Sequence, residues 1–274
     1  MQLEVSLTPA LYPYRTLKEN HATVAIDVLR ATTAVCAAFQ AGCREVVPLD
    51  SLEALEPYRQ QGYSIAAERG GKKLPGSDYG NSPTEYMSKD MSGVRLAYST
   101  TNGTVSILRG ADASRTFVGA FANLDALCAR LLQEGRDIVL LCSGWQNDFC
   151  IEDTLVAGAI IDRLIHFIAS SNDTCPHQPQ AAATPSSLEG EPDGLLEAVD
   201  IRSVDGGMCV KGDAAQMALD LWRLAQADPF AFCQKASHVH RLEGFGAQAD
   251  IEFAFRLNTC PVVPVLENGI LRID

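Results

Sequence analysis

The chain has 274 residues, 47% of them hydrophobic and 20% charged, which is the composition of a globular protein with a substantial core. It carries 22 Lys and Arg against 34 Asp and Glu, a formal net charge of −12. This acidic balance excludes a general electrostatic surface for nucleic acid or for an anionic membrane. It leaves room for a local basic pocket that binds a small anion.

Neither membrane insertion nor secretion is indicated by the sequence. No apolar run approaches the ~20 residues that span a bilayer. Residues 1–15 alternate like a strand and lack the basic and apolar regions of a signal peptide. The nine cysteines are scattered without a Cys-x-x-Cys pair, so a disulfide framework or a thiolate zinc site is not expected. We therefore expect a cytoplasmic protein with reduced thiols.

Short apolar segments alternate with amphipathic ones, which predicts an α/β fold with a parallel or mixed sheet. The expected strands are residues 21–29, 45–49, 63–67, 95–99, 116–121 and 137–143, and a final hairpin joins 262–266 to 270–273 through Asn268-Gly269. The expected helices are residues 31–41, 51–61 (capped by Ser51), 105–109, 124–134 and 151–168, followed by a helical region at 213–235.

Residues 170–194 break the alternation. They are rich in Pro, Ser, Ala and Gly and show no hydrophobic period. This composition predicts an exposed, flexible insertion in what is otherwise one functional unit spanning 1–274.

The first chemically dense motif is IDVLRATT, residues 26–33, at the end of a strand and the start of a helix. Asp27 is a candidate metal ligand and catalytic carboxylate, and Arg30 is a candidate for catalysis and for binding a phosphate together with Thr32 and Thr33. The alternative is that Asp27 and Arg30 form a salt bridge while Thr32 caps the helix.

The second motif is STTNGT, residues 99–104, again between a strand and a helix. Its hydroxyls, amide and glycine could form a backbone nest for an anion, although it is not a Walker P-loop. The alternative is an ordinary capped turn. The candidate substrate-binding residues are Thr100, Thr101, Asn102, Gly103 and Thr104.

The third motif follows the strand at 137–143. Gly144 is a candidate substrate-binding residue in the loop, and Glu152 and Asp153 lie in the first turn of the next helix. Acidic residues there are stabilised by the helix dipole, but two carboxylates also suit Mg²⁺. Adjacent helical residues point about 100° apart, so we expect only one of the two to be a direct ligand.

The fourth segment combines the end of a strand with a long polar loop, and such loops are often functional. Glu68 is a candidate catalytic carboxylate and metal ligand, and Arg69 is a candidate anion-binding residue. Asn81 and Ser82 in the loop at 76–83 are further candidates for binding the substrate.

The pair His238 and His240 would place both imidazoles on one face of a strand. Such a pair could bind a metal, but the preferred interpretation is a surface strand, because no third nitrogen or sulfur ligand has a matching spacing.

The four candidate carboxylates all lie at strand ends or helix starts. Because Mg²⁺ favours oxygen ligands, we expect Asp27, Glu68 and one or both of Glu152 and Asp153 to lie within reach of one coordination sphere.

Taken together, the motifs resemble the 2-phosphosulfolactate phosphatase (ComB) family. The resemblance rests on IDVLRATT, on ERGG followed by GSDYGNSPTEY, on STTNGT, and on the Glu-Asp segment at 142–158. The closing stretch 242–264 is also similar, so the resemblance covers the whole chain except 170–194. One departure is the run Trp145-Gln146-Asn147-Asp148, where the family pattern suggests a shorter turn with a glycine; another is Cys260, in a segment that does not align.

The resemblance implies a Mg²⁺-dependent hydrolase that converts (2R)-2-phospho-3-sulfolactate to 3-sulfolactate and phosphate, a step of coenzyme M biosynthesis in methanogens. It also implies a three-layer arrangement of two α/β lobes with the site between them. The partner is then a small phosphate or sulfonate anion, and self-association is left open.

Three alternatives remain at the level of sequence. A haloacid-dehalogenase-type phosphatase also has an aspartate at the end of its first strand, but its Asp-x-Asp pattern is interrupted here by Leu29. The substrate could be another small phosphorylated hydroxy acid. The same loops could also belong to a non-catalytic anion-binding protein.

Overall fold

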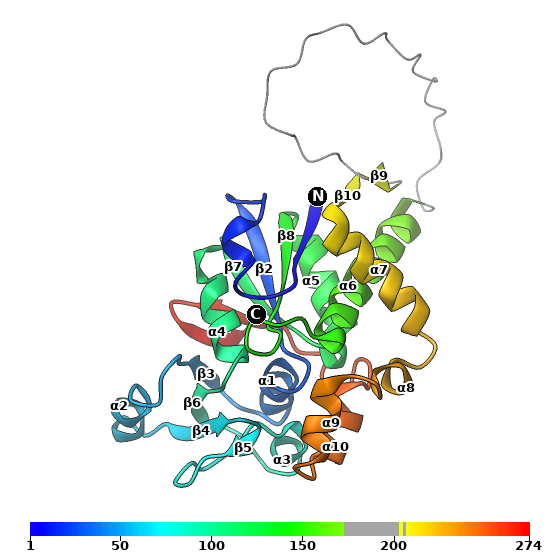
Figure 1. The fold of residues 1–274 in the computed structure, drawn as a ribbon. Helices are drawn as coiled ribbons and strands as arrows, with labels where there is room; N and C mark the ends of the chain where they lie inside the picture. The colour runs from blue at the N-terminus through cyan, green and yellow to red at the C-terminus, as the bar shows by residue number, and fades with distance from the viewer. Residues whose placement is uncertain (173–202, 205–206) are drawn as a thin grey trace, which may run out of the picture.

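Strands alternate with helices throughout the computed structural model, which describes residues 1–172, 203–204 and 207–274 (Figure 1). The predicted insertion at 170–194 lies outside the described residues except for its first three, which complete the helix Ile151–Asn172. Among the described residues, no helix is both long enough and apolar enough to cross a membrane.

The described strands form one mixed sheet in which two parallel groups are joined by an antiparallel hairpin. One group holds β3, β4 and β6, and the other holds β1, β2, β7, β8 and β10. The order is β5 (Lys72–Lys73), β4 (Ser64–Arg69), β6 (Arg95–Ser99), β3 (Glu45–Pro48), β12 (Ile270–Ile273), β11 (Pro264–Glu267), β7 (Arg115–Gly119), β2 (His21–Ile26), β8 (Asp137–Cys142), β1 (Gln2–Ser6), β10 (Met208–Lys211) and β9 (Ser203–Val204).

Helices cover both faces of the sheet, because its strands are apolar on both sides. In β2, Val24 packs in the core shared with α5, α6 and α7, whereas Ala25 packs in the core around α1. The predicted α/β fold is therefore confirmed. The helices are α1 (Ala31–Gln40), α2 (Leu55–Gln60), α3 (Pro83–Met87), α4 (Gly103–Arg109), α5 (Leu124–Glu134), α6 (Ile151–Asn172), α7 (Gly212–Ala225), α8 (Pro229–Cys233), α9 (Ser237–Glu243) and α10 (Gln248–Ala254), with short 3₁₀ turns at Tyr12–Tyr14, Gly110–Asp112 and Phe121–Asn123.

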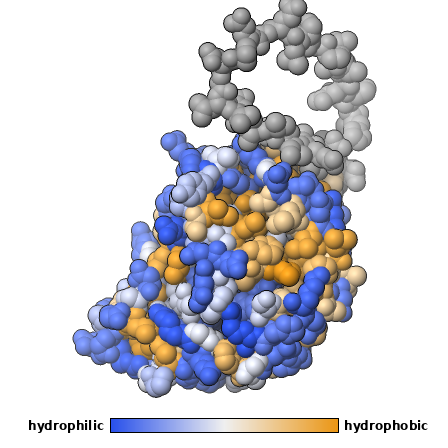
Figure 2. All heavy atoms as spheres, in the orientation of Figure 1, coloured by the Kyte–Doolittle hydropathy of each residue, from blue (hydrophilic) through white to orange (hydrophobic). Residues whose placement is uncertain are grey.

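On the face drawn in Figure 2, apolar residues gather toward α6 and α7 and hydrophilic residues surround them. Helix α7 keeps Met217 and Leu224 exposed on its outer side, while Leu219 and Trp222 pack inward against the core. The helix is therefore amphipathic, although some apolar side chains remain on its outer face.

Two local predictions are wrong. The helix expected at 51–61 begins at Leu55, because the Ser51 hydroxyl accepts from Ala54 N in the preceding turn and does not cap the helix. The strand expected around His238 and His240 is helix α9, in which residues two apart point about 200° from each other. His238 is accordingly buried, whereas His240 is exposed.

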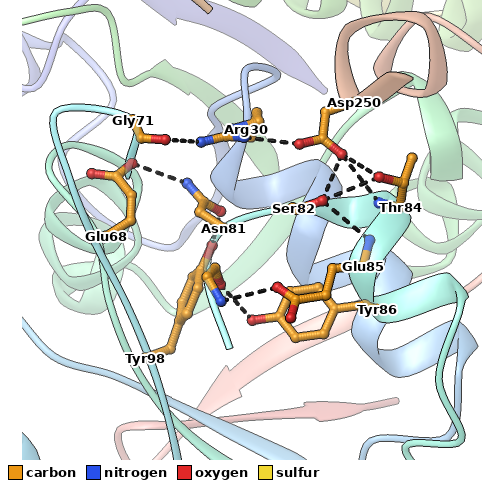
Figure 3. A network of polar contacts seen from close by, with 11 residues as sticks. Arg30, Glu68, Gly71, Asn81, Ser82, Thr84, Glu85, Tyr86, Tyr98 and Asp250 are labelled. Carbon is orange, nitrogen blue, oxygen red and sulfur yellow. Dashed lines mark hydrogen bonds and ion pairs between the residues drawn. The ribbon is translucent and has the colours of Figure 1, made fainter. Parts of the chain in front are cut away.

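A buried polar network joins distant parts of the chain (Figure 3). Arg30, just before α1, forms an ion pair with Asp250 of α10 at 2.8 Å and donates to the carbonyl of Gly71. Asp250 also accepts from the hydroxyls of Ser82 and Thr84 at the start of α3. Arg30 and Asp250 are 7% and 6% exposed, so this pair holds α10 against the first motif with little solvent screening.

A second close contact fixes α6 against α7. A Cβ atom placed on Gly158 would lie 2.0 Å from the carbonyl oxygen of Ala218 and 2.8 Å from Cβ of Trp222. Glycine is therefore required at residue 158 for the two helices to pack at this distance.

We expect Asp250→Asn to lower the free energy of unfolding by about 3 kcal/mol or more, because it leaves the buried Arg30 guanidinium without its counter-charge. In a chain of this size that corresponds to a fall in Tm of roughly 6–12 °C, measurable by thermal denaturation. Glu252→Gln, on the exposed side of the same helix, is the control and should leave Tm within about 1 °C. Equal Tm values for the two variants would show that the ion pair does not stabilise the fold.

We expect Gly158→Ala to destabilise the protein by about 1–3 kcal/mol, because the added methyl group overlaps the backbone of α7. Alanine is the better helix former by roughly 1 kcal/mol, so intrinsic propensity would give the opposite sign. Ser170→Ala, at an exposed position of the same helix, provides the comparison. A Tm of Gly158→Ala at or above that of the wild type would rule out the steric explanation.

Candidate active site

Parallel strands bring the predicted motifs to one edge of the sheet. Ile26 at the end of β2 pairs with Cys142 at the end of β8, and Ala67 of β4 pairs with Ser99 of β6. The residues that follow these four positions, including Asp27 and Glu68, therefore lie at the carboxyl edge of their parallel group of strands.

Asp27 is a buried carboxylate, 6% exposed, directly after β2. Its Oδ1 accepts from Ala31 N at 3.2 Å, and a Cβ atom on Gly103 would lie 2.7 Å from its Oδ2. Burial raises the pKa of Asp27 to about 6; the nearby His238 opposes this shift, while the negative charges of Glu68 and Glu152 add to it. Glycine at residue 103 is therefore what allows α4 to begin beside this carboxylate.

The threonines of the first motif are used by the fold. Thr32 Oγ1 donates to the carbonyl of Asp27 and accepts from its N–H, and Thr33 Oγ1 donates to the carbonyl of Val28. Both side chains are fully buried, so neither hydroxyl faces solvent. The alternative of a salt bridge between Asp27 and Arg30 is wrong, because Arg30 forms its ion pair with Asp250 instead.

The second motif is built as a capped turn. Thr100 Oγ1 accepts from Thr104 N at 3.1 Å, and Thr104 Oγ1 accepts from Thr100 N at 3.3 Å. Asn102 precedes α4 but makes no side-chain capping bond to it. The capped turn that the sequence analysis gives as the alternative is thus present, and an anion nest formed by Thr101, Asn102 and Gly103 stays a prediction.

Glu68 is held by hydrogen bonds from two of the predicted residues. One carboxylate oxygen accepts from Thr101 Oγ1. The other accepts from Asn81 Nδ2, and Asn81 in turn accepts from Tyr98 (Figure 3). Arg69 donates to the Glu68 carbonyl and to Ser99 Oγ. The network fixes the orientation of this carboxylate, and each of its oxygens keeps a further lone pair.

Of the adjacent acidic residues on α6, Asp153 is engaged by the backbone. Its Oδ1 accepts from Val28 N and its Oδ2 from Gly144 N, both at 2.9 Å. Asp153 thus fastens the ends of β2 and β8 to the start of α6. Gly144, with φ +57°, is required by the tight turn that follows β8, since a Cβ atom there would meet the Asp148 carbonyl oxygen at 2.1 Å.

Glu152 is different, because neither of its oxygens has a hydrogen-bond partner among the described residues, although the side chain is only 1% exposed. Its Oε1 lies 2.9 Å from Nδ1 of His238, but the two groups are not aligned as a hydrogen bond. Cys150 Sγ lies 4.0 Å from the same nitrogen. Of the two acidic residues, Glu152 is therefore the one whose carboxylate is not held by backbone hydrogen bonds.

Sequence reasoning missed Arg241, which lies one helical turn after His238 on α9. Its guanidinium stacks on the Trp145 ring, with Cζ 3.2 Å from the ring centroid. Within the described chain, its Nε and Nη2 are buried without a partner, and burial lowers the pKa of this arginine. If this segment is taken as a helix, the i, i+3 spacing places His238 and Arg241 on the same face, and this spacing is the signal that could have identified Arg241.

Arg241 and Trp145 line a cavity of about 230 Å³, which lies between the loop that follows β8 and the segment leading into α9. The cavity is lined by the Glu152 carboxylate, which contacts His238, by the Arg241 guanidinium, whose Nε and Nη2 have no partner among the described residues, and by Lys235. Such a site can bind a cation and an anion side by side.

The four predicted carboxylates lie near one another in the site. Besides burial, the charges of Glu68 and Glu152 raise the pKa of Asp27, and those of Glu152 and Asp27 raise the pKa of Asp153. In the described residues, the three ligand atoms that lie within 4.8 Å of one another belong to Cys150, Glu152 and His238. A Mg²⁺ site shared by the four carboxylates stays a prediction.

Comparison with known proteins agrees with the motifs. The family model described as 2-phosphosulpholactate phosphatase matches residues 6–269. A probable 2-phosphosulfolactate phosphatase of Caldanaerobacter subterraneus subsp. tengcongensis is 28% identical over 262 residues, covering 94% of this chain and 92% of the relative. One from Synechococcus sp. (strain CC9605) is 32% identical over 279 residues and 99% of both chains. The chain belongs to the 2-phosphosulfolactate phosphatase family.

Proposed function

We propose that this chain is a phosphatase that hydrolyses (2R)-2-phospho-3-sulfolactate. Water adds to phosphorus, the P–O bond to the sulfolactate oxygen breaks, and that oxygen takes up a proton to give 3-sulfolactate and inorganic phosphate. The observation that carries the proposal is the cavity that brings the buried Glu152 carboxylate, whose oxygens have no hydrogen bond, together with the buried and unpartnered Nε and Nη2 of Arg241. The names of the relatives support the choice of substrate.

The substrate has phosphate, sulfonate and carboxylate groups, so an acidic protein needs cationic groups concentrated at one place. Arg241 offers two unpartnered nitrogens, Nε and Nη2, from a guanidinium that stacks on the Trp145 ring. A guanidinium can donate in a fork to two oxygens of a sulfonate or a phosphate. Lys235 adds a second positive charge at the edge of the same cavity.

We further propose that the reaction depends on Mg²⁺ and that Glu152 holds it. Mg²⁺ usually takes one or two carboxylates together with substrate phosphate oxygens, and the unpartnered Glu152 oxygens fit that requirement. When bound, the cation would neutralise charge on the phosphoryl group. Asp27 completes the proposal as the residue that accepts the proton of the attacking water at Oδ2, the oxygen that faces Gly103.

The first test is release of inorganic phosphate from 2-phosphosulfolactate by the purified chain, with and without Mg²⁺. We expect Glu152→Gln, which keeps the shape and removes the charge, to lower kcat/KM by about 100-fold or more, roughly 2.7 kcal/mol of transition-state stabilisation. Glu56→Gln, at an exposed residue of α2, makes the same chemical change away from the cavity and should leave kcat/KM unchanged.

Two results would contradict the proposal. Tight binding of the substrate without turnover would identify a non-catalytic anion-binding protein. Faster turnover of another phosphorylated hydroxy acid, such as 2-phospholactate, would assign a different substrate to the same chemistry.

The second test asks whether Arg241 binds the sulfonate. We expect Arg241→Lys to lower kcat/KM for 2-phosphosulfolactate by about 10-fold, roughly 1.4 kcal/mol, and to leave kcat/KM for 2-phospholactate nearly unchanged. The reason is that only the first substrate carries the sulfonate that a forked donor would bind. An equal loss for both substrates, at unchanged Tm, would place Arg241 on the phosphate or carboxylate instead.

A further inference from the structure

We propose that Trp145 is a positioning residue, which holds the Arg241 guanidinium against its ring so that Arg241 selects a substrate that carries a sulfonate. This inference rests on the proposed function, in which Arg241 binds the sulfonate of 2-phosphosulfolactate. The two residues come from segments far apart in sequence, the loop after β8 and helix α9, and both line the same cavity.

Trp145 begins a two-residue hairpin turn. Its N–H donates to the Asp148 carbonyl at 3.0 Å, and the Asp148 N–H donates to the Trp145 carbonyl at 2.8 Å. Between them, Gln146 and Asn147 have φ values of +52° and +63°. Two positive φ values are typical of a type I′ turn, which asparagine tolerates but which glutamine adopts only at a cost. Because such backbone strain clusters at ligand-binding sites, it directs attention to the side chain that the turn carries at the cavity.

The backbone that carries Trp145 is held on the side of the sheet. The Ser143 N–H donates to the carbonyl of Ile26 at 2.8 Å, which continues the pairing of β8 with β2. The Gly144 N–H donates to Asp153 Oδ2 at 2.9 Å. These two bonds fix the chain immediately before Trp145, so its ring has a defined position relative to α6.

The Trp145 ring contacts two residues of α9. Its centroid lies 5.4 Å from that of the His238 ring, and Cζ of Arg241 lies 3.2 Å from it. Because residues three apart in a helix lie on one face, both contacts are made with the same side of α9. The indole therefore connects the loop after β8 to α9, with the guanidinium lying on its face.

Burial makes this contact important for Arg241. Its Nε and Nη2 are buried without a hydrogen-bond partner in the described part of the chain, and burial lowers the pKa of the side chain. Contact with the face of an indole stabilises a guanidinium most when the pair is shielded from water. The remaining cost of burial is removed when an oxyanion accepts from the two nitrogens.

The contact also determines which anion fits. Nε and Nη2 form one edge of the planar guanidinium, so their N–H groups donate in parallel to two acceptors. A sulfonate has three equivalent oxygens and offers such a pair of acceptors in several rotations about its C–S bond, whereas a methyl group at the same place offers none. Ordering a flexible arginine on binding costs free energy, so an arginine already held by Trp145 binds the sulfonate more tightly.

The experiment compares Trp145→Leu and Trp145→Phe with the wild-type full chain, using 2-phosphosulfolactate and 2-phospholactate in the presence of Mg²⁺. We expect Trp145→Leu to raise KM for 2-phosphosulfolactate about 10-fold and to leave kcat within about 2-fold, because the unsupported guanidinium must be ordered on binding. KM for 2-phospholactate, which has no sulfonate, should stay unchanged. Trp145→Phe keeps an aromatic face beside the guanidinium and should keep KM within about 3-fold of the wild type.

Phe167→Leu is the matched control. Phe167 also lies beside an arginine, with Cζ of Arg163 5.4 Å from its ring centroid, but of the residues described it is not among those that line the cavity. This variant should leave both KM values unchanged. A role of Trp145 in folding alone would instead lower kcat and Tm for Trp145→Leu and would affect both substrates equally.

Binding of the product provides a measurement that does not depend on turnover. By isothermal titration calorimetry, we expect 3-sulfolactate to bind Trp145→Leu about 10-fold more weakly than the wild type, and Trp145→Phe within about 3-fold of it.

Several outcomes would overturn the inference: an unchanged KM in Trp145→Leu, equal losses for both substrates, or a Trp145→Phe as impaired as Trp145→Leu. Hydrolysis of 2-phosphosulfolactate with the same KM by the wild type and Trp145→Leu would leave the proposed function standing without it. Binding of 3-sulfolactate that depends on Trp145, in a protein that hydrolyses no phosphate ester, would do the reverse. In such a protein, equal affinity of the wild type and Trp145→Leu for 3-sulfolactate, or no affinity in either, would contradict both proposals.

Discussion

The candidate site depends on the hydrogen bonds made by one carboxylate. Asp153 accepts from the backbone N–H of Val28 and of Gly144, and so joins the ends of β2 and β8 to the first turn of α6. Everything that α6 presents to the cavity is oriented by this contact, because Cys150 and Glu152 lie within three residues of it. The sequence predicts that only one residue of the Glu-Asp pair is a direct ligand, without choosing between them. In the fold, backbone hydrogen bonds hold Asp153, whereas the Glu152 carboxylate lies beside His238.

In the polar loops, too, most candidate groups bond to the protein itself and only a few remain available to a ligand. Many of the hydroxyl and amide groups that look suited to a substrate are already bonded to the protein, as the reciprocal contacts of Thr100 and Thr104 show. Such bonds are the expected result of burying polar loops, since unsatisfied groups would be costly. The groups most available for ligand are therefore the few that burial leaves unpaired, and among those described Glu152 and Arg241 lie in one cavity.

Much of the arrangement could be predicted from local sequence. Strands such as β8 are apolar runs bounded by polar residues, and the α/β pattern correctly predicts them; the strand order that pairs β2 with β8, and so brings Asp27 toward the loop of Gly144, is seen only in the structure. What could not be predicted is the pairing of residues far apart in the chain, such as Arg30 with Asp250, 220 residues later. Short helices are also weakly encoded. Helix α9 has only seven residues, and its histidines fit a strand equally well until Val239 and Leu242 are seen to pack inward together.

The antiparallel hairpin has a consequence for how the protein folds. Strands β11 and β12 follow every other described strand in sequence, yet they lie in the middle of the sheet, between β3 and β7. The two parallel groups can form their own pairings early, but they cannot become one sheet until residues 264–273 are inserted between them. Contacts of such long sequence separation slow folding, because the loop entropy is lost before the pairing is gained. During synthesis the unpaired edges of β3 and β7 are exposed until the hairpin arrives, which makes them the natural place for misassembly or for protection by a chaperone.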